Sequence, residues 1–167
     1  MDRTPARCLI LACGNTLRED DGLGPWLAEW ASERFRDEPR VRVLARQQWT
    51  PELAEEIAFS ESVIFIDCSA ESAPGLVNVA PVVPTVESPG LATHHLGAAQ
   101  LLALARELYD ALPLNAQLLT IGAGALGLRE GFSNLVQAAL PHATRRLEEL
   151  VLPALSDAGT QRPTRQS

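Results

Sequence analysis

Residues 8–25 read CLILACGNTLREDDGLGP, an apolar run that passes directly into a loop with three consecutive acids. The acids are Glu19, Asp20 and Asp21, and glycines flank them on both sides. Like charges that follow one another along a chain repel, so an ordinary loop gains nothing from them. The stretch therefore indicates either a solvated turn or a place where something cationic binds.

Four runs of strand-forming residues recur along the chain, and a fifth, weaker run alternates between apolar and polar residues. The strong runs are residues 6–13, 40–45, 62–68 and 116–123, and the weak run is residues 75–81. The run SVIFIDC at 62–68 is apolar almost throughout, which is typical of a strand covered on both faces. The weak run is typical of an edge strand.

Helical patterns fill the intervals between these runs, at residues 24–35, 50–58, 94–112 and 133–155. In the third pattern the residues expected on the buried face are Leu101, Leu104, Ala105, Leu108 and Leu112.

Strands that alternate with helices predict an α/β fold. We expect a three-layer sandwich, with a mostly parallel, twisted five-stranded sheet and helices on both faces. Residues 1–155 should form one domain, and the polar segment 156–167 should be a disordered tail.

Composition excludes several classes of protein. The chain has 167 residues, enough to bury a core, and its net charge of -7 comes without the basic stripe that a nucleic-acid surface needs. No apolar run approaches the roughly 20 residues of a membrane span, and the N-terminus does not resemble a signal peptide. Three cysteines in apolar contexts favour a reducing cytoplasm over a disulfide framework.

Candidate site residues follow from the predicted sheet. In parallel sheets, ligands bind beyond the carboxyl ends of the strands. The acidic loop follows the first strand, Asp67 ends the third, and the THHLG segment with His94 follows the loop after the edge strand. Two carboxylates and an imidazole would form a ligand set for a divalent transition metal.

Simpler interpretations of the same residues stay open. Asp20 or Asp21 could only cap a helix, and Asp67 could only bind the amides of the next loop. His94, taken alone, could be a hydrogen-bonded histidine without a catalytic role. Cys13 and Cys68 flank the expected site, but packing residues are the better interpretation of both.

The segment GAGALG at residues 122–127 matches the G-x-G-x-x-G pattern of dinucleotide-binding proteins. That fingerprint needs a helix that starts within the motif and an acidic residue after the next strand. Here LREGFSN intervenes, so we do not interpret the segment as a nucleotide site.

Three motifs, GNTLREDDGLGP, VIFIDCS and THHLG, resemble in this order those of the [NiFe]-hydrogenase maturation endopeptidases. The resemblance extends over about residues 7–152, nearly the whole chain. It implies a twisted sheet between helix layers. It also implies an enzyme that removes a short C-terminal extension from the hydrogenase large-subunit precursor, after nickel has been inserted.

The resemblance also implies roles for individual residues. Asp21, Asp67 and His94 match the family's metal-binding positions, and Asp20 matches the acid that precedes the first ligand. The implied metal is nickel carried by the substrate, with another divalent metal such as zinc as the alternative. We expect metal-assisted amide hydrolysis in which Asp20 or Asp67 is the general base. The resemblance selects His94 as the ligand, and not His95.

Two departures from the family pattern concern the surroundings of the site. Ala12 stands where the family usually has a glycine, and ARQQWTPEL at residues 45–53 replaces a Gly-Gly-Thr loop found in many members. Gln48 and Trp49 are bulky where others are small. Trp49 could line the substrate cleft or belong to the core.

Two functions from other classes remain as alternatives. One is a non-catalytic, metal-sensing chaperone or checkpoint protein for hydrogenase assembly, which would use the same three ligands. The other is a flavodoxin-like binding domain for a phosphate, which the acids disfavour because they repel anions.

Overall fold

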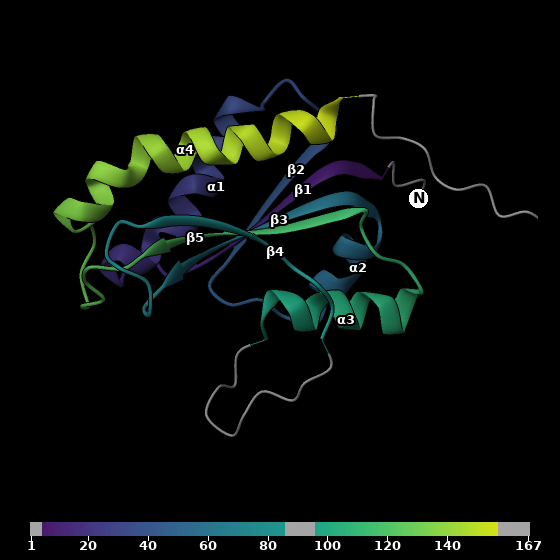
Figure 1. The fold of residues 1–167 in the computed structure, drawn as a ribbon, viewed down its shortest axis with the longest axis horizontal. Helices are drawn as coiled ribbons and strands as arrows, with labels where there is room; N and C mark the ends of the chain where they lie inside the picture. The colour runs from purple at the N-terminus through teal and green to yellow at the C-terminus, as the bar shows by residue number, and fades with distance from the viewer. Residues whose placement is uncertain (1–4, 86–95, 157–167) are drawn as a thin grey trace, which may run out of the picture.

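The computed structural model describes residues 5–85 and 96–156. Its strands form one sheet in the order β2-β1-β3-β5-β4 (Figure 1). The strand bounds are β1 (Ala6–Cys13), β2 (Val41–Arg46), β3 (Ser60–Ser69), β4 (Val77–Pro81) and β5 (Asn115–Gly122). All neighbours pair in parallel except β4, which pairs antiparallel with β5 at the edge of the sheet. The sheet confirms the predicted fold class and the predicted edge strand.

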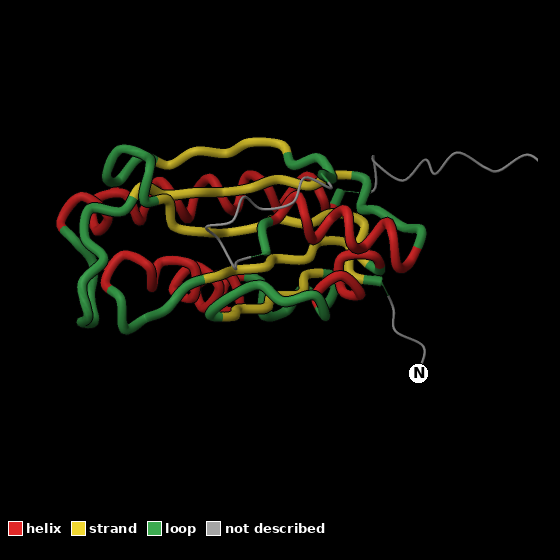
Figure 2. The backbone as a smooth tube through the Cα atoms, turned by 90° about the horizontal axis from the view of Figure 1, so that it is seen from below, coloured by secondary structure: helices red, strands yellow, loops and turns green. Residues whose placement is uncertain are grey.

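Helices cover both faces of this sheet (Figure 1). Their bounds are α1 (Leu23–Arg34), α2 (Leu53–Ala58), α3 (Ala98–Tyr109) and α4 (Asn134–Leu155), and a one-turn 3₁₀ helix, η1 (Glu19–Gly22), precedes α1. Helices α1 and α4 lie on one face, and α2 and α3 on the other. Figure 2 shows the strands side by side along the length of the molecule.

Alternation along β1 and β3 divides the core into two halves. Ile10 and Ile64 pack with the residues of α1 and α4, whereas Leu9 and Phe65 pack with those of α2 and α3. These four side chains are at most 2% exposed. Because successive side chains of a strand point to opposite faces, this pattern also sets the direction of every later residue in each strand.

Two glycines let η1 and α1 fold back tightly on the end of β1. Gly14 has φ +150, and a Cβ built on it would lie 2.0 Å from the carbonyl oxygen of Asp21. A Cβ on Gly24 would lie 2.1 Å from the carbonyl oxygen of Cys13. The glycines that flank the three acids are therefore needed for close approach of the backbone.

The third helix differs from the prediction in both its bounds and its buried face. It begins at Ala98, with Gly97 as its N-cap, and ends at Tyr109, with Asp110 as a C-cap in the left-handed conformation. Leu101 and Ala105 are buried as predicted, but Leu108 is 59% exposed. Leu112 lies beyond the helix and is 39% exposed. The helix ends before its last predicted turn can pack on the sheet.

None of the helices in the described part of the chain has the length and apolar character that crossing a bilayer requires. Apart from Ser156, the expected tail at 156–167 lies outside the described residues.

Substitution of Gly24 by alanine should lower the free energy of unfolding by about 3 kcal/mol or more, because the new methyl group meets the backbone of β1. Gly97→Ala is the matched control, since its Cβ would meet only the end of the Gln100 side chain at 3.6 Å. Urea unfolding of both variants measures the difference. Equal stabilities would show that η1 and α1 can move away from β1 at little cost.

Candidate active site

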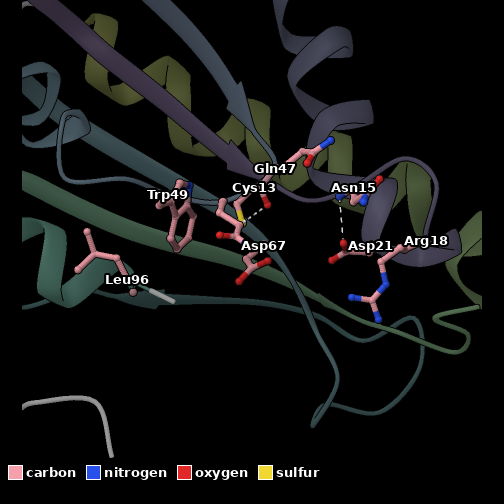
Figure 3. A pocket seen from close by; sticks show the side chains of 10 residues that line it. Cys13, Asn15, Arg18, Asp21, Gln47, Trp49, Asp67 and Leu96 are labelled. Carbon is pink, nitrogen blue, oxygen red and sulfur yellow. Dashed lines mark hydrogen bonds between the residues drawn. The ribbon is translucent and has the colours of Figure 1, made fainter. Parts of the chain in front are cut away.

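The sheet topology places a cleft at the carboxyl ends of β1 and β3. The chain passes from β1 to β2 on one side, and β3 lies on the other, so the strand order reverses between β1 and β3. Ligands of open α/β sheets bind at such a reversal. A cleft of about 350 Å³ lies there (Figure 3). Its lining residues are Cys13, Asn15, Arg18, Asp21, Gln47, Gln48, Trp49, Asp67, Leu96 and Gly97.

Asp21 enters the cleft from η1. The backbone N–H of Asn15 donates a hydrogen bond to Oδ2 of Asp21 at 3.0 Å, and the Asn15 side chain in turn accepts one from the N–H of Leu17. Figure 3 shows the carboxylate of Asp21 directed into the space that Asp67 also faces. The Gly14–Asn15 turn therefore sets the position of the first predicted ligand.

Asp67 enters the same cleft from β3. The last paired residues of β1 and β3 are Ala12 and Ile66, so Cys13 and Asp67 are neighbours on the face that carries Leu9 and Phe65. The N–H of Cys68 donates to Oδ1 of Asp67 at 2.8 Å. The sequence prediction that Asp21 and Asp67 come together is thus confirmed in the geometry of the cleft.

The thiols of Cys13 and Cys68 lie in the negative potential of these carboxylates. Burial, together with the negative charges of Asp67 and Asp21, raises the pKa of Cys13 to about 12. Burial and the same two charges also raise the pKa of Cys68 to about 12. Both thiols are therefore protonated at neutral pH and are poor nucleophiles. The two negative charges that contribute to these pKa shifts favour a cation in the cleft.

Asp20, the expected alternative base, is directed away from the cleft. It is fully buried, and its carboxylate accepts hydrogen bonds from the N–H groups of Gly124, Ala125 and Ser133 and from the Ser133 hydroxyl. These four bonds measure 2.7 to 2.8 Å. Burial alone would raise the pKa of Asp20, but the hydrogen bonds outweigh it and lower the pKa. This placement argues against Asp20 as a general base and gives it a structural role.

Glu19 fastens η1 to the same loop. Its carboxylate accepts a hydrogen bond from the N–H of Gly127 at 2.6 Å and pairs with Arg129. The hydrogen bond from Arg129, with that from Gly127, lowers the pKa of Glu19. Glu19 itself has a φ of +46, in the left-handed region that costs a non-glycine residue free energy. The contacts of its side chain hold this turn in place.

The binding partners of Glu19 and Asp20 were not predicted from the sequence. They belong to the loop that follows β5, and this loop contains the GAGALG segment. The amides of Gly124, Ala125 and Gly127 bind carboxylates of the protein itself. The sequence did contain one signal for this contact: a glycine-rich segment, whose amides can approach carboxylates closely, and a run of acids elsewhere in the chain.

The third predicted ligand, His94, lies outside the described residues, as does His95. Helix α3 begins at Ala98, whereas the helical pattern of the sequence begins at His94. Within residues 5–85 and 96–156, no three His, Cys, Asp or Glu side chains form a group that could hold a metal ion. The described part of the cleft therefore supplies two of the three predicted ligands.

Trp49 belongs to both the cleft and the core. It lines the cleft beside Gln47 and Gln48, yet it is only 8% exposed. Its ring packs edge-on against Phe65, with ring centroids 5.3 Å apart. Its indole Nε1 is buried and has no hydrogen-bond partner among the described residues. Trp49 is therefore a core residue that also lines the cleft, and its contact with a substrate stays a prediction.

Solved structures with a similar fold include several hydrogenase maturation proteases. The hydrogenase maturating endopeptidase HybD from Escherichia coli is 23% identical, with a TM-score of 0.71 over 87% of this chain and 91% of that one. The [NiFe] hydrogenase maturation protease HybD from Thermococcus kodakarensis is 25% identical, with a TM-score of 0.65 over 86% and 98% of the two chains. An endopeptidase from Escherichia coli, also 25% identical, has a TM-score of 0.68 over 92% and 94%.

In its fold this chain is similar to the hydrogenase maturation endopeptidases over nearly its whole length. No protein-family model matches its sequence, and no curated protein matches it. The predicted resemblance to this family is thus confirmed by the fold of the described residues.

We predict that Asp20→Asn lowers the free energy of unfolding at pH 7 by at least about 2 kcal/mol, because the amide presents a donor to groups that are themselves donors. The pKa of Asp20 is lowered from 3.8 in the folded protein. Its contribution is therefore fully present above that value and is lost as the pH falls through the lowered pKa.

The wild-type protein should accordingly lose stability below about pH 4 more steeply than Asp20→Asn does. Glu107→Gln, at an exposed position, is the control. Chemical unfolding at a series of pH values makes the comparison. Parallel pH profiles for wild type and Asp20→Asn would contradict the role given to these hydrogen bonds.

Trp49→Ala should lower the free energy of unfolding by about 3–5 kcal/mol, as loss of a buried aromatic ring does. Trp49→Phe should cost clearly less, because a ring still packs on Phe65 and the buried N–H without a partner is removed. Thermal unfolding followed by circular dichroism distinguishes the two. Two equally small losses would show that Trp49 only lines the cleft.

Proposed function

We propose that this protein is an endopeptidase that removes a C-terminal extension from the large-subunit precursor of a [NiFe] hydrogenase after nickel insertion. The observation that supports this most is the pair of carboxylates, Asp21 and Asp67, that face one cleft at the strand-order reversal. The fold around this pair is that of named maturation endopeptidases. The nickel of the precursor is then part of the substrate.

The chemistry of the cleft fits a divalent cation. Two carboxylates supply oxygen donors, and their charges already raise the pKa values of both neighbouring thiols. A cation would offset the repulsion between Asp21 and Asp67. In this proposal His94 supplies the third donor, and nickel or another divalent ion such as zinc would polarise the carbonyl of the scissile bond.

The residues of the chain itself have separate tasks in the proposed reaction. Asp67 accepts a proton from the attacking water, since Asp20 is saturated with hydrogen bonds and does not line the cleft. Asp21, which the Asn15 amide holds in place, faces the opposite side of the reacting group. Gln47, Gln48 and Trp49 form the wall against which the polypeptide would lie. These bulky side chains favour a substrate different from that of members with a Gly-Gly-Thr loop.

The deciding experiment incubates the purified protein with a nickel-loaded large-subunit precursor from the organism that encodes it. Mass spectrometry then measures whether the precursor loses a C-terminal peptide of fixed length. We expect shortening by the wild type, and a rate lower by at least about 100-fold in Asp67→Asn. Metal-free precursor is the substrate control.

His94→Ala and His95→Ala form a matched pair in the same assay, and calorimetry with nickel or zinc measures their metal affinity. His94→Ala should lose both activity and affinity, while His95→Ala keeps most of each. A precursor that binds but stays intact would favour the metal-sensing chaperone. Loss of activity only in His95→Ala would shift the proposed ligand by one residue.

A further inference from the structure

A second pocket lies on the other side of η1 from the cleft. Its volume is about 290 Å³. Its lining residues are Thr16, Glu19, Gly22, Pro25, Trp26, Glu29, Glu130, Gly131 and Phe132. None of these residues lines the cleft. The residue of η1 that does line the cleft is Asp21. The short helix η1 is therefore a wall common to the two spaces.

Aromatic rings form the apolar side of this pocket. Trp26 and Phe132 pack edge to face, with ring centroids 6.3 Å apart and an interplanar angle of 85°. Both side chains are only half-buried. A tryptophan face is the best partner for a cation among the aromatic side chains. The contact of the two rings fixes Trp26 against the loop that follows β5.

Carboxylates form the polar side of the pocket. Glu29 of α1 and Glu130 of the loop after β5 are exposed, and neither makes an ion pair or hydrogen bond with another described residue. Glu19 differs, because Arg129 and the amide of Gly127 already bind it. The pocket thus combines an aromatic face with two carboxylates that are available to an outside group.

Two exposed leucines belong to the two loops that Glu19 joins, and both lie close in sequence to residues that line the pocket. Leu17, between the pocket residue Thr16 and the cleft residue Arg18, is 57% exposed. Leu128, between Gly127 and Arg129, is 90% exposed. Exposed leucines beside a shaped pocket are typical of a surface that contacts another polypeptide. A free small molecule would leave both of them uncovered.

We propose that this pocket binds an arginine side chain of a polypeptide partner. A guanidinium group is planar, stacks on aromatic faces and donates hydrogen bonds from several edges at once. It therefore matches one aromatic side and two carboxylates better than a compact ammonium group does. The methylenes of arginine would cover the ring of Phe132, and the chain around the arginine would cover Leu17 and Leu128.

Identification of this partner as the hydrogenase precursor rests on the proposed function, but the arginine pocket itself does not. A polypeptide that crosses η1 would enter the cleft on one side and this pocket on the other. The pocket would then select the polypeptide by a residue outside the reacting bond.

The test uses N-acetyl-arginine N-methylamide as the probe and its neutral isostere, N-acetyl-citrulline N-methylamide, as the matched ligand. Two-dimensional NMR follows the indole N–H signal of Trp26. This signal is assigned by its absence from the spectrum of Trp26→Phe. We expect saturable shifts with the arginine probe and affinity about tenfold weaker for the citrulline probe. The double variant Glu29→Gln and Glu130→Gln should reduce the arginine affinity to the citrulline level.

A double variant at two exposed acids elsewhere, Glu71→Gln and Glu107→Gln, keeps the same net charge as the first and should bind like the wild type. Equal shifts with both probes, or no shift of the Trp26 signal, would overturn the proposal. Because no precursor is present, this result is independent of the cleavage assay. Cleavage of the precursor without arginine binding would overturn only the proposed arginine site. Arginine binding without cleavage would overturn only the proposed function.

Discussion

The buried carboxylate of Asp20 holds the functional end of this molecule together. A buried charge is unfavourable unless hydrogen bonds compensate it, and here three amides and a hydroxyl of the loop after β5 do so. Glu19 adds a second attachment to the same loop. With η1 fixed in this way, Asp21 faces the cleft and Gly22 faces the second pocket. Each of the three consecutive acids has different surroundings, which is why their mutual repulsion is tolerated.

Much of the sheet follows from local sequence patterns. The run at 62–68 is apolar because β3 lies in the middle of the sheet, between β1 and β5, and is covered on both faces. Residues 75–81 alternate because β4 is an edge strand. The third helix was less predictable, since its apolar pattern continues through Leu108 and Leu112 although the helix leaves the core before them. A periodic pattern gives the buried face of a helix only where the rest of the fold covers it.

In the candidate site, too, some features follow from local sequence patterns and others depend on the rest of the fold. Asp21 and Asp67 could be predicted as neighbours, because parallel strands bring their carboxyl ends to one edge of the sheet. The partners of Asp20 could not, because they lie 104 to 113 residues away in the sequence. A contact of that kind depends on how β5 places its following loop, and neither the run of acids nor the glycine-rich segment shows by itself that the two meet. Sequence motifs therefore indicated which acids matter, but not that two of the three are structural.

The structural role of Glu19 and Asp20 changes how the proposed metal site, Asp21 and Asp67, should behave. Repulsion between Asp21 and Asp67 leads one to expect a loose site that only a cation can organise. Yet Asp21 is held by the Asn15 amide, Asp67 by the amide of Cys68, and η1 by the carboxylates of Glu19 and Asp20. Protein atoms alone therefore hold these two carboxylates against their repulsion. A site arranged in advance spends less binding free energy on ordering its ligands. Selectivity for a loaded substrate would then depend on the charge of the metal that the substrate carries more than on movement of the cleft walls.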